Sequence, residues 1–75
     1  MSKNYISSNI RTLRFHKDEM TQQQLADAVD VTRQTIVAIE KGKYSPSLEL
    51  AFKLARVFDK KLDEVFAYEP IGDKK

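Results

Sequence analysis

The chain has 75 residues, a net charge of +2 and 41% hydrophobic residues, which fits one domain with a small core. It has no cysteine, a single histidine (His16) and no apolar run near the roughly 20 residues that span a bilayer. These features argue against disulfide frameworks, metal sites and membrane proteins, and the N-terminus has no apolar signal core, so we expect a cytoplasmic protein with no metal and no cofactor.

Helical periodicity recurs along the chain, and the alternation typical of strands is hard to find, so we expect an all-α fold. The first helix is expected over residues 7–17. Ile6, Ile10 and Leu13 follow each other at i, i+4 and i+7, which gives one apolar stripe. The polar residues 17–19 then break the pattern.

The second helix is expected over residues 22–28. Thr21 is a good N-cap, and Gln24 stands three residues later, where it completes a capping box. Leu25, Ala26 and Val29 are expected to face inward. Asp30 follows, and aspartate tolerates the left-handed backbone conformation that a tight turn needs.

Three further helices are expected over residues 33–41, 48–58 and 62–66. Thr32 and Ser47 provide hydroxyl caps, and Gly42 ends the third helix at its C′ position. The residues after Phe66 are expected to form an extended or loose tail.

The connection between the second and third helices is only about four residues long, which forces a sharp angle, as in a helix-turn-helix. Ala26 allows the third helix to approach closely. Ile36 and Ile39 define the buried side of that helix.

The opposite side of the third helix carries amide, cationic and small apolar groups and no acid. A glutamine can pair with adenine, an arginine with guanine, and a small apolar group can touch the thymine methyl. This side therefore favours contact with DNA bases, although an ordinary solvated helix face remains the alternative. Its residues are Arg33, Gln34, Val37, Ala38 and Lys41.

Two other features of the sequence support this interpretation. Glu40 projects toward the flank of the core, where Arg14 of the first helix is able to reach it; the alternative is a solvated, unpaired glutamate. Phosphate contacts are expected at Gln22 and in the loop after the third helix, for which a plain polar loop is the alternative. That loop contains Lys43, Tyr44 and Ser45.

The run from Thr21 to Gly42, with residues 46–51 and 62–66 after it, resembles the helix-turn-helix of the lambda/434 repressor and Cro family, also called the xenobiotic response element family. The short chain is most similar to stand-alone members such as the cytolysin repressor group. The resemblance implies a five-helix lambda-repressor-like DNA-binding domain over residues 1–67, a C-terminal tail over residues 68–75, and a homodimer with its third helix in the major groove.

The family positions imply roles for individual residues. Thr32, Arg33, Gln34 and Ala38 would face bases, whereas the helical positions alone favour Val37 and Lys41 more strongly. Gln22, Lys43, Tyr44 and Ser45 would face phosphates, and Arg14 and Glu40 match the structural ion pair of the family.

The sequence departs from the family pattern at three places. Asp30 stands where glycine is usual, one extra residue lies between Arg14 and Met20, and Lys61 replaces the usual hydroxyl cap of the fifth helix.

The fifth helix and the tail carry more apolar groups than so small a core needs. We therefore expect a homodimer interface there, the alternative being that these groups complete the core of one protomer. The residues are Leu62, Val65, Phe66, Tyr68 and Ile71.

The function expected from the sequence is that of a sequence-specific regulator of transcription. It would bind double-stranded DNA, acting as a repressor at a pseudo-palindromic operator. The alternative is an antitoxin or a protein-interaction adaptor with the same fold. An enzyme is not expected, because one histidine at a helix end builds no catalytic arrangement.

Overall fold

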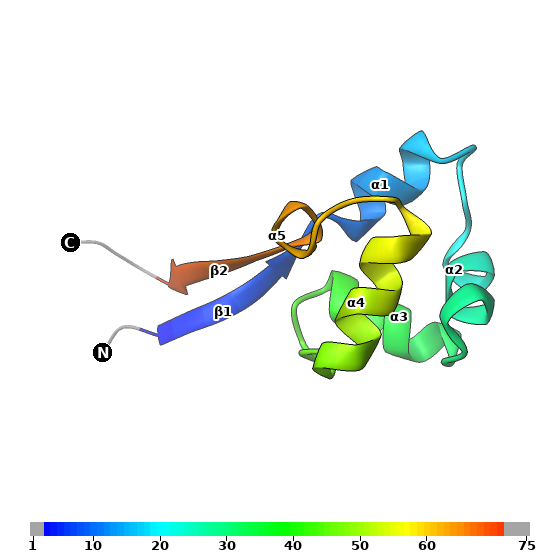
Figure 1. Cartoon of the computed structure of the whole chain (residues 1–75). Coiled ribbons are helices and arrows are strands. Elements are labelled where there is room, and N and C mark those ends of the chain that lie inside the picture. The colour runs from blue at the N-terminus through cyan, green and yellow to red at the C-terminus, as the bar shows by residue number, and fades with distance from the viewer. Residues whose placement is uncertain (1–2, 72–75) are drawn as a thin grey trace.

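The computed structural model describes the backbone of residues 3–71 and the side chains of residues 6–68. The elements follow each other as β1 (Lys3–Ser8), α1 (Ile10–His16), α2 (Gln22–Val29), α3 (Arg33–Glu40), α4 (Leu48–Val57), α5 (Leu62–Val65) and β2 (Phe66–Ile71). The helices pack into one body, and the two strands run away from it side by side (Figure 1). The expected five-helix fold is confirmed.

The two strands form an antiparallel terminal ribbon that the sequence analysis did not predict. Ile6 pairs with Tyr68 and Ser8 with Phe66. At the base of the ribbon the Asn9 N–H donates to the Val65 carbonyl at 2.8 Å. The prediction of helix from residue 7 is therefore wrong: the backbone there pairs with β2, and α1 begins at Ile10.

The terminal ribbon includes residues that were predicted to belong to a separate C-terminal tail. The predicted domain boundary after Ala67 falls inside β2, which pairs along its length with β1. Residues 72–75 of the predicted tail lie outside the described residues. Within the described part of the chain, no helix is long and apolar enough to cross a membrane.

The core takes one fully buried large side chain from each helix. These side chains are Ile10, Leu25, Ile36, Leu54 and Val65. Each stabilises the fold by about 1.5–3 kcal/mol relative to an exposed position. The expected inward residues of the second and third helices are all buried, which confirms their predicted orientation: Leu25, Ala26, Val29, Ile36 and Ile39.

The helix ends follow the predicted capping. The Gln24 N–H donates to Thr21 Oγ1 at 3.0 Å, and the Thr21 N–H donates to Gln24 Oε1 at 2.9 Å, so the capping box of α2 is formed. Thr32 and Ser47 cap α3 and α4 through their hydroxyl oxygens. Each cap satisfies an N–H that the helix itself leaves without a partner.

Left-handed residues end both helices of the helix-turn-helix. Asp30 has φ 62° and Gly42 has φ 74°. The N–H groups that follow them fold back onto their helices: Val31 donates to the Ala26 carbonyl at 3.0 Å, and Lys43 to the Ala38 carbonyl at 2.9 Å. These bonds fix the directions in which the chain enters and leaves α3.

Replacing Asp30 with glycine is expected to stabilise the fold by about 0.5–1 kcal/mol. Glycine adopts the left-handed conformation without steric cost, and removing a carboxylate from the C-terminal end of α2 improves the interaction with the helix dipole. The larger conformational entropy of unfolded glycine offsets part of the gain. Urea unfolding measures the change, and Asp30→Val is the control, which we expect to destabilise. The same stability for the wild type and both variants would contradict strain at this turn.

The extra residue before α2 is absorbed by two consecutive left-handed residues, Asp18 with φ 55° and Glu19 with φ 52°. The Met20 N–H then bonds to the Arg14 carbonyl at 2.9 Å, which ties the loop to the end of α1. At α5 the Lys61 N–H donates to Glu64 Oε1 at 2.8 Å. This bond supports the short helix without a hydroxyl cap.

Candidate nucleic-acid interface

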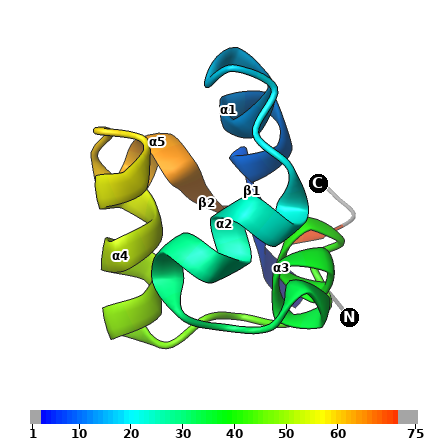
Figure 2. The same ribbon diagram turned by 90° about the vertical axis from the view of Figure 1, so that its right-hand side faces the viewer.

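The outer face of α3 is available at the surface of the helical body. Figure 2 shows α2 crossing the middle of this body, with α4 on its left, α3 on its right and α1 above it. Because Ile36 and Ile39 are buried, the opposite side of α3 is turned outward. Of the predicted base-contacting residues, Val37 and Ala38 are half-buried, and the others are exposed: Thr32, Arg33, Gln34 and Lys41.

This side of the molecule carries cations without acidic partners. Among the side chains of residues 6–68, ion pairs form between Arg14 and Glu40 and between Lys53 and Glu49. Arg33, Lys41 and Lys43 therefore have no ion-pair partner within that range. Unpaired exposed cations attract an anionic ligand, and their effect weakens as salt is added.

The three residues of the loop after α3 that were expected at phosphates are all exposed. They are Lys43, Tyr44 and Ser45. Gly42 and the Lys43 N–H bond to Ala38 hold the start of this loop against the end of α3. The loop thus presents a cation, a phenol and a hydroxyl beside the outer face of α3, all of them groups that are able to contact phosphate oxygens.

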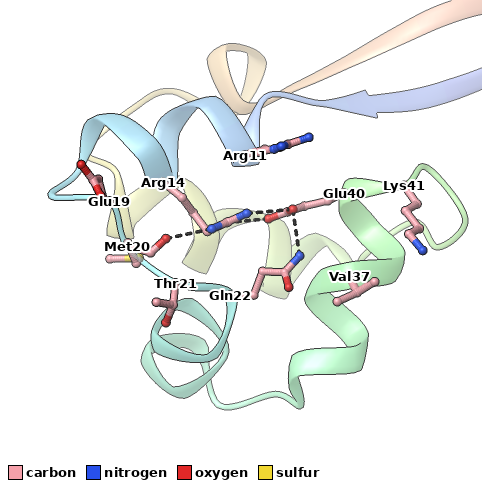
Figure 3. A pocket seen from close by; sticks show the side chains of 9 residues that line it. All are labelled: Arg11, Arg14, Glu19, Met20, Thr21, Gln22, Val37, Glu40 and Lys41. Atoms are coloured by element: carbon pink, nitrogen blue, oxygen red, sulfur yellow. Dashed lines mark hydrogen bonds and ion pairs between the residues drawn. The ribbon is translucent and has the colours of Figure 1, made fainter.

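The expected ion pair between Arg14 and Glu40 is present and doubly hydrogen-bonded. Arg14 Nε lies 2.7 Å from Glu40 Oε2, and Arg14 Nη2 lies 3.1 Å from Glu40 Oε1. Arg14 Nη1 also donates to the Met20 carbonyl at 2.8 Å. The two side chains are 14% and 9% exposed. Figure 3 shows Arg14 at the centre of these bonds, which join α1, the loop before α2, and α3.

Gln22 takes part in the same network, which the sequence analysis missed. Gln22 Nε2 donates to Glu40 Oε1 at 3.2 Å, so the first residue of α2 is tied to the last residue of α3. Its contact with phosphate stays a prediction, and its side chain has a positioning role that the spacing of the sequence did not reveal.

A polar depression of about 570 Å³ lies above this network, between α1, the start of α2 and the end of α3. Gln22, Val37 and Lys41, which were predicted to contact DNA, line this depression. Arg33 and Gln34, which were also predicted to contact DNA, lie outside it. Arg11 also lines the depression and was not predicted. The sequence did offer one indication that Arg11 lies near Arg14: it stands three residues before Arg14 on the same helix, where side chains are neighbours.

The residues expected at a dimer interface have three different outcomes. A second, mostly apolar depression is lined by Ile6, Leu62, Phe66 and Tyr68, and Tyr68 is 68% exposed. Val65 is 0% exposed and points into the core, so its assignment to a dimer interface is wrong. Ile71 belongs to β2, and its side chain lies outside the described residues.

Two short helices joined at a fixed left-handed turn, with the second presenting a polar and cationic face, define a helix-turn-helix protein. The helix-turn-helix family model matches residues 10–65, which is most of the chain. The chain belongs to this family of DNA-binding transcriptional regulators, and is accordingly a regulator rather than an enzyme.

Relatives by sequence carry names that agree with the family. An HTH-type transcriptional regulator of Methanocaldococcus jannaschii is 58% identical over 50 residues, which are 67% of this chain and 76% of the relative. The cryptic phage CTXphi transcriptional repressor RstR of Vibrio cholerae is 42% identical over 52 residues, 69% of this chain and 46% of the repressor.

The fold recurs in solved structures. The transcriptional regulator VanUg superimposes with a TM-score of 0.71 at 18% identity, over 89% of this chain and 88% of that protein. The arrangement of helices is thus maintained where little of the sequence is shared.

Proposed function

We propose that the protein is a sequence-specific repressor of transcription that binds a pseudo-palindromic operator as a homodimer, with α3 in the major groove. The observation that carries this proposal is the first turn of α3. Arg33 and Gln34 are exposed there, and neither has an ion-pair or hydrogen-bond partner among the side chains of residues 6–68. Their donor groups are free for a ligand.

The dimensions of α3 suit the major groove. The groove is about 12 Å wide, and a helix with its side chains is about 10–12 Å across. Arg33 and Gln34 stand at the N-terminal end of the helix, which is the end that meets base edges in helix-turn-helix complexes. An arginine reads guanine and a glutamine reads adenine through paired hydrogen bonds. The methyl groups of Thr32, Val37 and Ala38 are suited to thymine.

The proposed phosphate contacts lie near the C-terminal end of this helix. Gln22 opens α2 and is bonded to Glu40, the last residue of α3, and the loop with Lys43, Tyr44 and Ser45 follows the same end of α3. Backbone contacts there would fix the register of α3 against the bases.

The relative named as a phage transcriptional repressor supports repression. A small DNA-bound dimer that lies across a promoter blocks access by excluding the polymerase, and this needs no second domain. The alternative of an antitoxin or adaptor shares the fold and has less support, because the relatives found by sequence are named as transcriptional regulators or repressors.

A gel-shift experiment with the DNA upstream of the gene itself tests the function. We expect a shifted complex that survives an excess of random duplex and protects two half-sites from cleavage. Transcription from that promoter in vitro is expected to fall as the complex forms. Equal competition by operator and random DNA would overturn sequence-specific binding.

The proposed dimer contact is the mostly apolar depression formed by Ile6, Leu62, Phe66, Ala67 and Tyr68, with one acid, Asp63, in its lining. Ile6 and Tyr68 are direct partners in the terminal ribbon, and Phe66 stands two residues before Tyr68 on the same face. A twofold contact through this face would place the two α3 helices on one side of the DNA. The expected half-site spacing is about 34–36 Å, one turn of the duplex.

Replacing Tyr68 with glutamate is expected to convert the dimer to a monomer. It would place a second carboxylate beside Asp63 in the mostly apolar contact, which costs several kcal/mol, while the fold of the protomer stays intact because the side chain is 68% exposed. Sedimentation at micromolar concentration measures the change. Phe15→Glu is the matched control, since Phe15 is 64% exposed on α1, and this variant is expected to stay dimeric. A dimeric Tyr68→Glu would place the contact elsewhere.

A further inference from the structure

Asp63 is the one acid in the mostly apolar depression proposed for the dimer contact. Asp63 is exposed on α5, and its carboxylate forms no ion pair with a side chain of residues 6–68. The proposed contact therefore contains a negative charge that the protomer itself does not neutralise. The other described residues that line the depression are uncharged: Ile6, Leu62, Phe66, Ala67 and Tyr68.

A twofold contact through this depression gives the charge no cation. In such a contact the same patch of both protomers meets. The second copy therefore brings the same uncharged side chains and a second Asp63, with no lysine or arginine among the described residues of the patch. A carboxylate that loses water without gaining a cation costs free energy. Each protomer thus contributes one group that opposes association.

The neighbouring acid Glu64 differs from Asp63 in both respects. Glu64 lies outside the lining of this depression, and its Oε1 accepts the Lys61 N–H at 2.8 Å. Both acids stand in the first turn of α5, where a negative charge interacts favourably with the helix dipole. Glu64 therefore supports the start of the helix, whereas Asp63 adds its charge to the proposed contact.

The small size of the contact makes this charge important. A stable interface takes about 20–30 residues from each side. The depression is lined by six residues, and Asp63 is one of them. Because the free energy of association is the small surplus left after the cost of ordering two molecules, one carboxylate without a cation changes it by a large fraction.

We infer that Asp63 limits the strength of the homodimer, so that the free protein dissociates on dilution and the two protomers reassemble on the operator. Two adjacent half-sites hold the protomers side by side, which raises their effective concentration. Occupancy of the operator then rises steeply with the amount of protein, because both half-sites fill together. The inference rests on the proposed function and adds to it a response of the regulator to its own concentration.

Sedimentation of Asp63→Asn over a series of concentrations tests the strength of the dimer. The change removes the charge and keeps the size of the side chain. The dimer dissociation constant is expected to fall about tenfold, the effect of one charged group left without a partner. Asp63→Ser, a second variant that is compatible with the start of a helix, is expected to act in the same direction. Glu64→Gln is the matched control: it makes the same charge change, still accepts from Lys61, and is expected to keep the wild-type constant.

Titration of operator DNA tests the response to concentration. The wild type is expected to bind with a Hill coefficient of about 2 in total protein. Asp63→Asn is expected to bind with a coefficient of about 1 at concentrations where it is already a dimer. Its affinity for the operator, expressed per dimer, is expected to equal that of the wild type, because the depression with Asp63 contains none of the proposed DNA contacts.

The outcomes separate this inference from the proposed function. A weaker dimer in Asp63→Asn would mean that the carboxylate is bound by a cation or by the Tyr68 hydroxyl of the second copy. Equal dimer constants for the wild type, Asp63→Asn and Glu64→Gln would place Asp63 outside the contact. Both results would overturn the inference while operator binding stands. A wild type that occupies single half-sites as a monomer at every concentration would overturn the proposed dimer and this inference together.

Discussion

Arg14→Ala is expected to lower the free energy of unfolding by about 3 kcal/mol, the largest effect on stability that we predict. The change removes three hydrogen bonds, two to Glu40 and one to the Met20 carbonyl. Glu40 would keep the bond from Gln22 alone, in a site where its side chain is 9% exposed. An acid left in such a site without its cation costs about 1–3 kcal/mol, and more when fully buried. Urea unfolding measures the loss.

The double variant Arg14→Met with Glu40→Leu is the control for this experiment. Replacing both charges by apolar groups leaves no unpaired acid, so we expect it to recover much of the lost stability. DNA affinity of Arg14→Ala is expected to fall mainly through weaker folding. An unchanged melting temperature with lost binding would mean that Arg14 contacts DNA directly.

The helix-turn-helix was predictable because its determinants are local. A hydroxyl cap, an amide three residues later and a residue that accepts positive φ act within one or two turns of chain. Thr21, Asp30, Thr32 and Gly42 therefore placed α2 and α3 within a residue of their observed ends. Helical spacing also identified the buried side of α3.

The terminal ribbon was missed because its partners lie at opposite ends of the chain. Ile6, Ile10 and Leu13 have the spacing of an apolar helix face, and nothing near Ile6 in sequence favours a strand. The strand forms because Ile6 pairs with Tyr68, 62 residues away. Strand pairing over such separations has no local signature, unlike a helix cap.

The burial of Val65 was not predicted because it also depends on tertiary packing. α5 is a single turn of four residues, so its side chains point in all directions around the axis. Which of them face the core depends on how α5 sits on α4, and spacing within four residues does not decide this. The position of Arg11 beside Gln22 and Lys41 depends on packing in the same way, because three separate helices build the depression that these residues line.

Gln34→Ala is expected to weaken operator binding by about 1–3 kcal/mol, the largest effect on specificity. Gln34 is exposed in the first turn of α3, and alanine is a better helix former, so folding is not expected to suffer. The lost amide would remove one paired contact to adenine and relax the preference at one base pair of each half-site. No charge is removed, so the salt slope and the affinity for random duplex are expected to stay unchanged.

Lys43→Ala provides the opposite pattern. Lys43 lies in the loop after α3, where its ammonium group carries charge but little geometric information. Its loss is expected to weaken operator and random duplex alike and to lower the salt slope by about one unit per half-site. Titrations of both variants over a series of salt concentrations distinguish the two kinds of contact. If Gln34→Ala instead loses affinity equally for operator and random DNA, the first turn of α3 does not read bases, and the reading face must be centred on Val37 and Lys41.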